Sequence, residues 1–62
     1  MNAERQEVIM KKMYWFIFNQ NGEIISKEYE TEKEAENAMK NGSYDDGEVP
    51  EYVDGLELEE NN

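Results

Sequence analysis

Apolar and aromatic side chains gather in one dense run early in the chain, and a second run follows a short polar break. The first run, residues 12–18, reads Lys-Met-Tyr-Trp-Phe-Ile-Phe and is rich in aromatic and β-branched residues, which favour strands. After the polar stretch 19–22, residues 23–30 resume a strand-like pattern. The pair Asn21-Gly22 is typical of a two-residue type I′ turn, in which both residues take positive φ. We therefore predict a β-hairpin over about residues 8–30.

A two-residue turn sets the pairing that we expect along this hairpin. It places Phe18 opposite Ile25 and Trp15 opposite Glu28. One hairpin face is then rich in aromatic residues. The other face is apolar as well, and it is formed by Met13, Trp15, Ile17 and Ile24. Both faces need cover, or one of them is left for a partner.

A helix is predicted from Glu32 to Asn41. Thr31 and Glu34 fit a capping box, in which each side chain accepts a hydrogen bond from a backbone N–H at the start of the helix. Gly42 is placed to end the helix in a left-handed conformation. The apolar stripe of this helix is thin, because it contains only Ala35, Ala38 and Met39.

Residues 43–62 are less clearly patterned. Pro50 excludes a regular central strand at its own position, whereas residues 52–58 fit either a third strand, with Leu56 and Leu58 on one face, or a disordered segment. The predicted fold class is α+β, a small β-hairpin followed by one α-helix (β-β-α), with the short third strand left open. We expect a flexible leader at residues 1–7, a single domain at 8–58 and a disordered acidic tail at 59–62.

The composition removes several ways of stabilising so short a chain. With 62 residues and no cysteine or histidine, the domain has no disulfide, no thiolate metal site and no imidazole ligand. The core must be apolar, or must be completed by self-association or by a partner. The longest apolar run has six residues, residues 13–18, against the roughly 20 that a membrane-spanning helix needs. We expect a cytoplasmic protein that does not bind membranes.

The sequence contains no recognisable catalytic or cofactor-binding motif. A hydroxyl nucleophile needs an activating base, and the chain has no histidine to serve as one. The hydroxyl candidates are Ser26, Thr31 and Ser43. The acids do not follow the spacing of an EF-hand loop, so we expect no specific metal site. We therefore predict a non-enzymatic protein without a cofactor.

Acidic residues dominate the charge of the chain, which is -10 at pH 7. The last twenty residues contain eight acids and no base, and such a segment repels nucleic acid and favours a basic protein surface. The commonest basic groove belongs to a nucleic-acid-binding protein. The predicted partner-binding residues are Glu28, Glu30, Glu32, Glu36, Asp45, Asp46, Glu48, Glu51, Asp54 and Trp15. The alternative is that the acids only keep the domain soluble.

In size and composition the chain resembles small acidic inhibitors encoded by phages, which include DNA mimics and anti-CRISPR proteins. The resemblance covers the whole chain and includes no motif, so it assigns no functional residue. It implies an inhibitor that occupies the nucleic-acid groove of a host protein. The alternative hypothesis is a small adaptor or assembly module that binds a protein, or a second copy of itself as a homodimer, through the apolar hairpin face.

Overall fold

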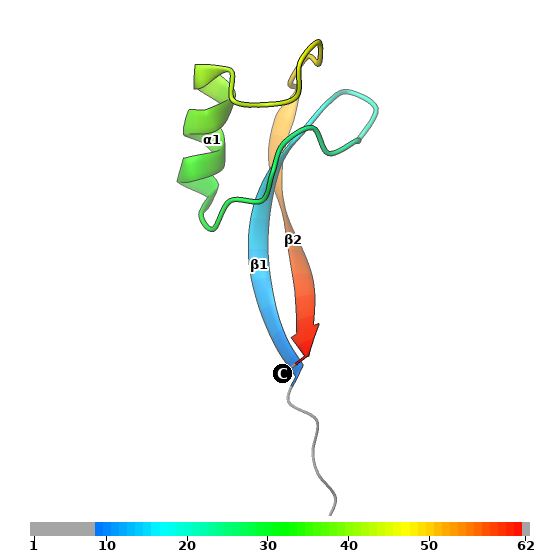
Figure 1. The fold of residues 1–62 in the computed structure, drawn as a ribbon, viewed down its shortest axis with the longest axis vertical. Helices are drawn as coiled ribbons and strands as arrows, with labels where there is room; N and C mark the ends of the chain where they lie inside the picture. Colours follow the sequence, from blue (N-terminus) through cyan, green and yellow to red (C-terminus); the bar gives the residue numbers. More distant parts are fainter. Residues whose placement is uncertain (1–8, 62) are drawn as a thin grey trace, which may run out of the picture.

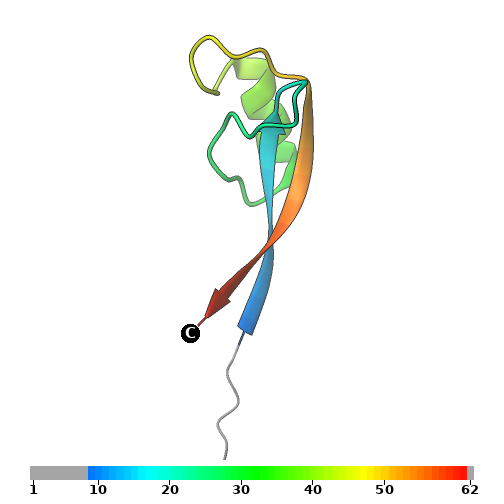
Figure 2. The same cartoon turned by 90° about the vertical axis from the view of Figure 1, so that its right-hand side faces the viewer.

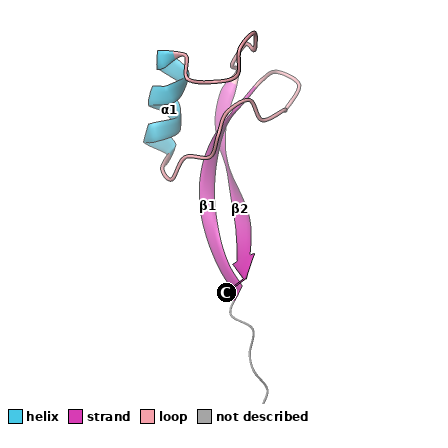
Figure 3. Ribbon diagram, viewed as in Figure 1, coloured by secondary structure: helices cyan, strands magenta, loops and turns pink. Residues whose placement is uncertain are grey.

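A computed structural model describes residues 9–61, which form one sheet and one helix. In chain order the elements are strand β1 (Ile9–Phe18), helix α1 (Glu32–Asn41) and strand β2 (Tyr52–Asn61) (Figures 1 and 3). The two strands are antiparallel neighbours, and α1 packs against both of them on one side of the sheet. The predicted α+β class, with its single helix, is confirmed.

The main partner of β1 is the C-terminal strand β2. The pairing runs without interruption from Ile9 opposite Asn61 to Phe18 opposite Tyr52. The third strand, which the sequence left open at 52–58, is therefore present, and it extends to Asn61. Residues 59–61, predicted to be a disordered tail, belong to β2, because backbone hydrogen bonds pair a strand whatever the charge of its exposed side chains. The predicted leader 1–7 lies outside the described residues.

The predicted hairpin partner, residues 23–29, lies along the other edge of β1 but pairs with it at only two places. Phe18 forms an isolated bridge with Ile24, and Trp15 forms one with Tyr29. Between these bridges β1 advances by three residues and the other segment by five, so the segment bulges. The bulge is stabilised by Ser26, whose Oγ accepts a hydrogen bond from the backbone N–H of Ile17 in β1 at 3.0 Å.

Next to the turn, the predicted register of this hairpin is wrong by one residue, since Phe18 pairs with Ile24 rather than Ile25, and the turn explains why. Gly22 has φ of 79°, whereas no other residue type has a positive φ among the described residues, so Asn21 does not adopt the type I′ conformation. The N–H of Gly22 donates to the carbonyl of Asn19, and the N–H of Asn19 donates to the carbonyl of Glu23, both at 3.0 Å. These bonds close a three-residue loop with a left-handed third residue. The extra loop residue shifts the pairing.

Helix α1 begins and ends where the sequence predicts. The Oγ1 of Thr31 accepts a hydrogen bond from the N–H of Glu34 at 3.1 Å, and Gly42 takes the left-handed conformation with φ of 79°. Ala35 and Ala38 are the buried residues of the helix. Small side chains let α1 lie close to the sheet, which leaves Ile17 fully buried at 0% exposure between them.

The sheet has one side that α1 covers and one that it does not. On the helix face, Ile17 and Val53 contact α1, and Trp15 lies next to Gly55. The side opposite α1, which we call the open face, carries the alternate residues Lys12, Tyr14, Phe16, Phe18, Tyr52, Asp54, Leu56 and Leu58. The exposed apolar face predicted from Met13, Trp15, Ile17 and Ile24 is therefore not a single surface, because Ile17 is in the core and Ile24 pairs with a residue of the open face.

The distal half of the β1–β2 ribbon extends well beyond the helix (Figures 1 and 2). We call this part, residues 9–14 and 56–61, the arm. On the β1 side the last pairing with the 23–29 segment is at Trp15, so within the described residues the arm consists of β1 and β2 alone. Across residues 9–61 as a whole, no helix is long and apolar enough to cross a membrane.

Candidate functional site

Two loops meet at the end of the molecule that lies farthest from the arm. One is the turn at residues 19–23, and the other is the loop at 43–51 (Figure 1). Neither loop contains a lysine or arginine. Together they carry five exposed carboxylates, which we call the acidic end: Glu23, Asp45, Asp46, Glu48 and Glu51. The charged side chains of these two loops are therefore all anionic.

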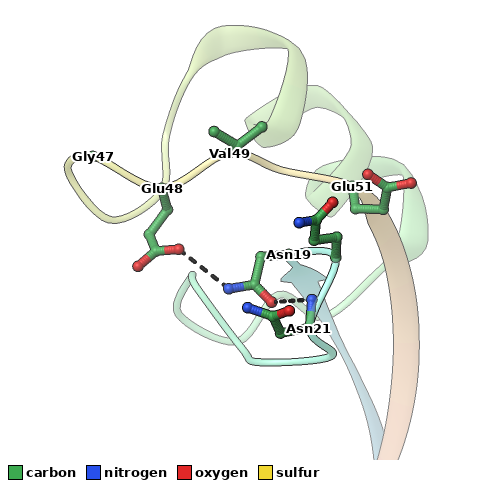
Figure 4. A pocket seen from close by; sticks show the side chains of 7 residues that line it. Asn19, Asn21, Gly47, Glu48, Val49 and Glu51 are labelled. Carbon is green, nitrogen blue, oxygen red and sulfur yellow. Dashed lines mark hydrogen bonds between the residues drawn. The ribbon is translucent and has the colours of Figure 1, made fainter.

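The side chain of Asn19 joins the two loops. Its Nδ2 donates to Oε1 of Glu23 at 2.9 Å and to Oε1 of Glu48 at 3.2 Å. Its Oδ1 accepts from the backbone N–H groups of Asn21 and Glu23 at 2.9 and 3.0 Å. Figure 4 shows the Glu48 carboxylate extending from one loop toward the Asn19 amide in the other. Asn19 is only 7% exposed, so these bonds also satisfy a buried polar group.

Backbone hydrogen bonds hold the 43–51 loop against the sheet. The N–H of Asp45 donates to the carbonyl of Ile25 at 2.8 Å, and the N–H of Glu51 donates to the carbonyl of Phe18 at 2.7 Å. Between these two anchors, the N–H of Glu48 donates to the carbonyl of Asp45 at 3.2 Å. The acids of this loop are therefore presented from an anchored backbone.

An open pocket of about 390 Å³ lies between the two loops. Its lining is mostly amide and carboxylate groups, from Asn19, Gln20, Asn21, Gly47, Glu48, Val49 and Glu51 (Figure 4). The described residues contain no group of carboxylates arranged to hold a metal ion. Side chains of this kind accept hydrogen bonds from ammonium and guanidinium groups.

The other predicted acids lie elsewhere and have basic neighbours. Glu28 and Glu30 flank Tyr29 in the irregular segment beside β1, so they do not form the regular strand ladder that the sequence suggested. Glu32 and Glu36 lie one turn apart on α1, as expected. Lys27 and Lys33 are interspersed with these acids in the sequence. The structure therefore separates this group from the acidic end.

The last two predicted site residues lie on the sheet. Asp54 is on the open face, and its Oδ1 accepts a hydrogen bond from the N–H of Gly55 at 2.8 Å. Trp15 is half-buried on the helix face, where its ring lies against the backbone of Gly55. Neither residue adjoins the acidic end, since Trp15 and Gly55 face each other midway along the ribbon.

Sequence reasoning did not identify Asn19 or Glu23 as part of the site. Asn19 was interpreted only as part of a polar turn, and Glu23 only as a strand residue. An asparagine at the first position of a turn favours a side-chain bond to the backbone two residues later, and this was the available signal. The contact with Glu48 is long-range and has no local pattern in the sequence.

Comparisons with protein-family models, with curated proteins and with solved structures gave no match for this chain. The residues and their geometry are therefore the whole basis for a functional assignment.

Proposed function

We propose that this chain is a non-enzymatic binding protein of the cytoplasm that attaches to a basic protein surface through its acidic end. The observation that carries the proposal is the junction of two base-free loops at Asn19, which gathers five exposed carboxylates at one end of the molecule. A concentrated anionic surface attracts basic grooves and repels nucleic acid. The class of partner that fits best is a protein whose groove binds nucleic acid, and occupying that groove inhibits it.

The anchored backbone of the acidic end supports this role. A disordered acidic tail loses conformational entropy when it binds, and that loss weakens the complex. Here the backbone of Asp45 is bonded to Ile25 of the 23–29 segment and that of Glu51 to Phe18 of β1, and the Glu48 carboxylate is held by Asn19. Anchored carboxylates present hydrogen-bond acceptors at set positions, which favours one partner over bulk cations.

The test compares two variants that remove the same charge from different places. The first replaces Asp45, Asp46, Glu48 and Glu51 with the corresponding amides, and Glu48→Gln retains the oxygen that accepts from Asn19. The matched control replaces Glu28, Glu30, Glu32 and Glu36 with glutamine. Each variant and the parent are used for affinity capture from the source cell, and binding to the captured protein is then titrated at several salt concentrations.

We expect the acidic-end variant to lose the captured partner and the control variant to retain it. The parent complex should weaken as salt rises, because salt screens exposed charges, and the acidic-end variant should lose most of that dependence. Nucleic acid bound by the partner should compete with the parent chain. Equal binding by both variants would show that net charge alone, rather than the acidic end, governs the interaction.

A further inference from the structure

The open face leaves apolar side chains exposed on the described part of the arm. Leu56 and Leu58 are successive open-face residues of β2 in the arm, and they are 37% and 40% exposed. Nearer the turn, Tyr52 on the same face is 41% exposed, whereas Phe16 and Phe18 are buried. The one helix of residues 9–61 lies on the other side of the sheet. A two-stranded ribbon is marginally stable in water by itself, and apolar area of this kind commonly marks an interface.

The edge of β2 is less suited to a partner than its face. Trp15 exchanges backbone hydrogen bonds with Tyr29, so the N–H of Gly55, which lies opposite Trp15, points away from β1 toward the outer edge. Asp54 Oδ1 accepts that N–H at 2.8 Å. The side chain thus occupies a backbone donor that an added strand needs, as edge-protecting charges do in other sheets.

The charges of the open face lie on either side of its Tyr14–Leu56 pair. Lys12 and Asp54 are its two charged residues among the described side chains of β1 and β2. Lys12 lies opposite Leu58, one same-face step from the Tyr14–Leu56 pair toward the end of the arm, and its Nζ is 5.5 Å from the centre of the Tyr14 ring. Asp54 is one step from that pair in the other direction.

We propose that the open face binds the open face of a second copy of this chain, with a two-fold axis crossing the strands at the Tyr14–Leu56 pair. This axis lays the strands of the two sheets antiparallel and places Lys12 of each copy beside Asp54 of the other. Leu56 of one copy then packs on Leu56 of its partner. The face is complementary to itself in charge, as a two-fold interface requires.

The proposal uses a different surface from the acidic end and does not depend on the proposed function. The acidic end lies at the opposite end of the molecule from the arm, so a dimer formed by the open face leaves both acidic ends exposed (Figure 1). Dimerisation would give a basic partner two acidic ends on one particle. Such bivalence raises affinity for a partner with two basic sites.

The test uses charge reversal and mixing, with sedimentation velocity over a dilution series as the measurement. Lys12→Asp alone and Asp54→Lys alone each place like charges across the interface, and each should weaken the dimer by about tenfold or more. An equimolar mixture of the two single variants restores both opposite-charge contacts in a mixed dimer. The mixture should therefore dimerise more tightly than either variant alone.

Two further variants complete the test. Leu56→Lys should abolish the dimer, whereas Lys33→Asp, on the exposed surface of α1, should leave it intact; circular dichroism verifies that each variant is folded. The acidic-end amide variant should still dimerise, which separates this proposal from the proposed function. A parent that remains monomeric at millimolar concentration overturns the proposal, as does a mixture that binds no better than the two single variants.

Discussion

Asn19 is a buried polar residue at the position where β1 gives way to the turn. Its amide group makes four hydrogen bonds, two of them to backbone N–H groups of the turn and two to carboxylates. Removing the side chain leaves those groups without their partner and opens a small cavity. We predict that Asn19→Ala lowers the free energy of unfolding by about 2 kcal/mol or more, measured by urea denaturation.

The matched control for Asn19 is Asn21→Ala in the same turn. Asn21 is exposed, and the turn uses its backbone N–H rather than its side chain. We expect this variant to remain within about 0.5 kcal/mol of the parent. Equal losses in the two variants would mean that the turn, and not the buried amide of Asn19, determines stability.

Gly22 tests the turn geometry at the next position. Its φ is 79°, and the nearest atom to an added Cβ is the hydroxyl of Tyr52 at 4.0 Å, so the site has room for a side chain. The cost of a substitution is then conformational. Gly22→Val should lower the thermal midpoint and cost about 1 kcal/mol or more, because β-branched residues rarely adopt positive φ. Gly22→Asn should cost less, since asparagine tolerates that region; the reverse order would contradict this reason.

At the scale of single elements, the helix depends on the capping hydrogen bond at its start. Thr31 Oγ1 accepts the N–H of Glu34 at 3.1 Å. We predict that Thr31→Ala costs about 1 kcal/mol of stability in chemical denaturation, because that N–H then has no acceptor. Thr31→Ser retains the hydroxyl and should remain close to the parent. If serine and alanine behave alike, the hydroxyl is not what stabilises the start of α1.

The middle of the ribbon depends on a close approach at Gly55. An added Cβ would lie 2.8 Å from the sulfur of Met13 and 3.1 Å from Cζ3 of the Trp15 ring. The methionine can move, but the ring has less freedom. We predict that Gly55→Ala costs about 1 kcal/mol or more and shifts the Trp15 fluorescence maximum, because the ring must move. Adding Met13→Ala should recover part of the stability and little of the spectral shift.

Local signals predicted the helix well and the hairpin only in part. The capping residues and Gly42 are adjacent in sequence to the helix that they delimit, so their pattern shows its ends. The turn was located correctly, but its loop length depends on the Asn19 side chain, which accepts the N–H of Glu23 as well as that of Asn21. A single additional loop residue was enough to exchange the faces expected for the paired strand.

The long-range pairing was harder to predict than either local element. β2 carries exposed acids along its length, so its pattern fitted disorder as well as it fitted a strand. Its backbone pairing with β1 does not depend on those side chains. The exposure of the acids was expected from their residue type. The proximity of Glu23 to the 43–51 loop was not, because it depends on tertiary contacts made by Asn19.

At the scale of the whole molecule, stability should fall along the ribbon from the helix to the end of the arm. The backbone N–H groups of Phe16 and Lys12 both point toward β2, but only Phe16 is at the level of the core. We predict that the amide hydrogen of Lys12 exchanges much faster than that of Phe16 in dilute protein, because opening the arm breaks few packing contacts. Hydrogen exchange followed by NMR measures this, and equal protection would show that the sheet opens as one unit.

The placement of β1 between two partners has a consequence for synthesis of the chain. Residues 19–51 separate β1 from β2, and translation at about 5 to 20 residues per second takes several seconds to deliver the second strand. During that interval β1 can pair only with the segment at 23–29, which is made directly after it. The nascent chain therefore carries one uncovered edge of its most aromatic strand, and contacts with chaperones or neighbouring nascent chains should concentrate there.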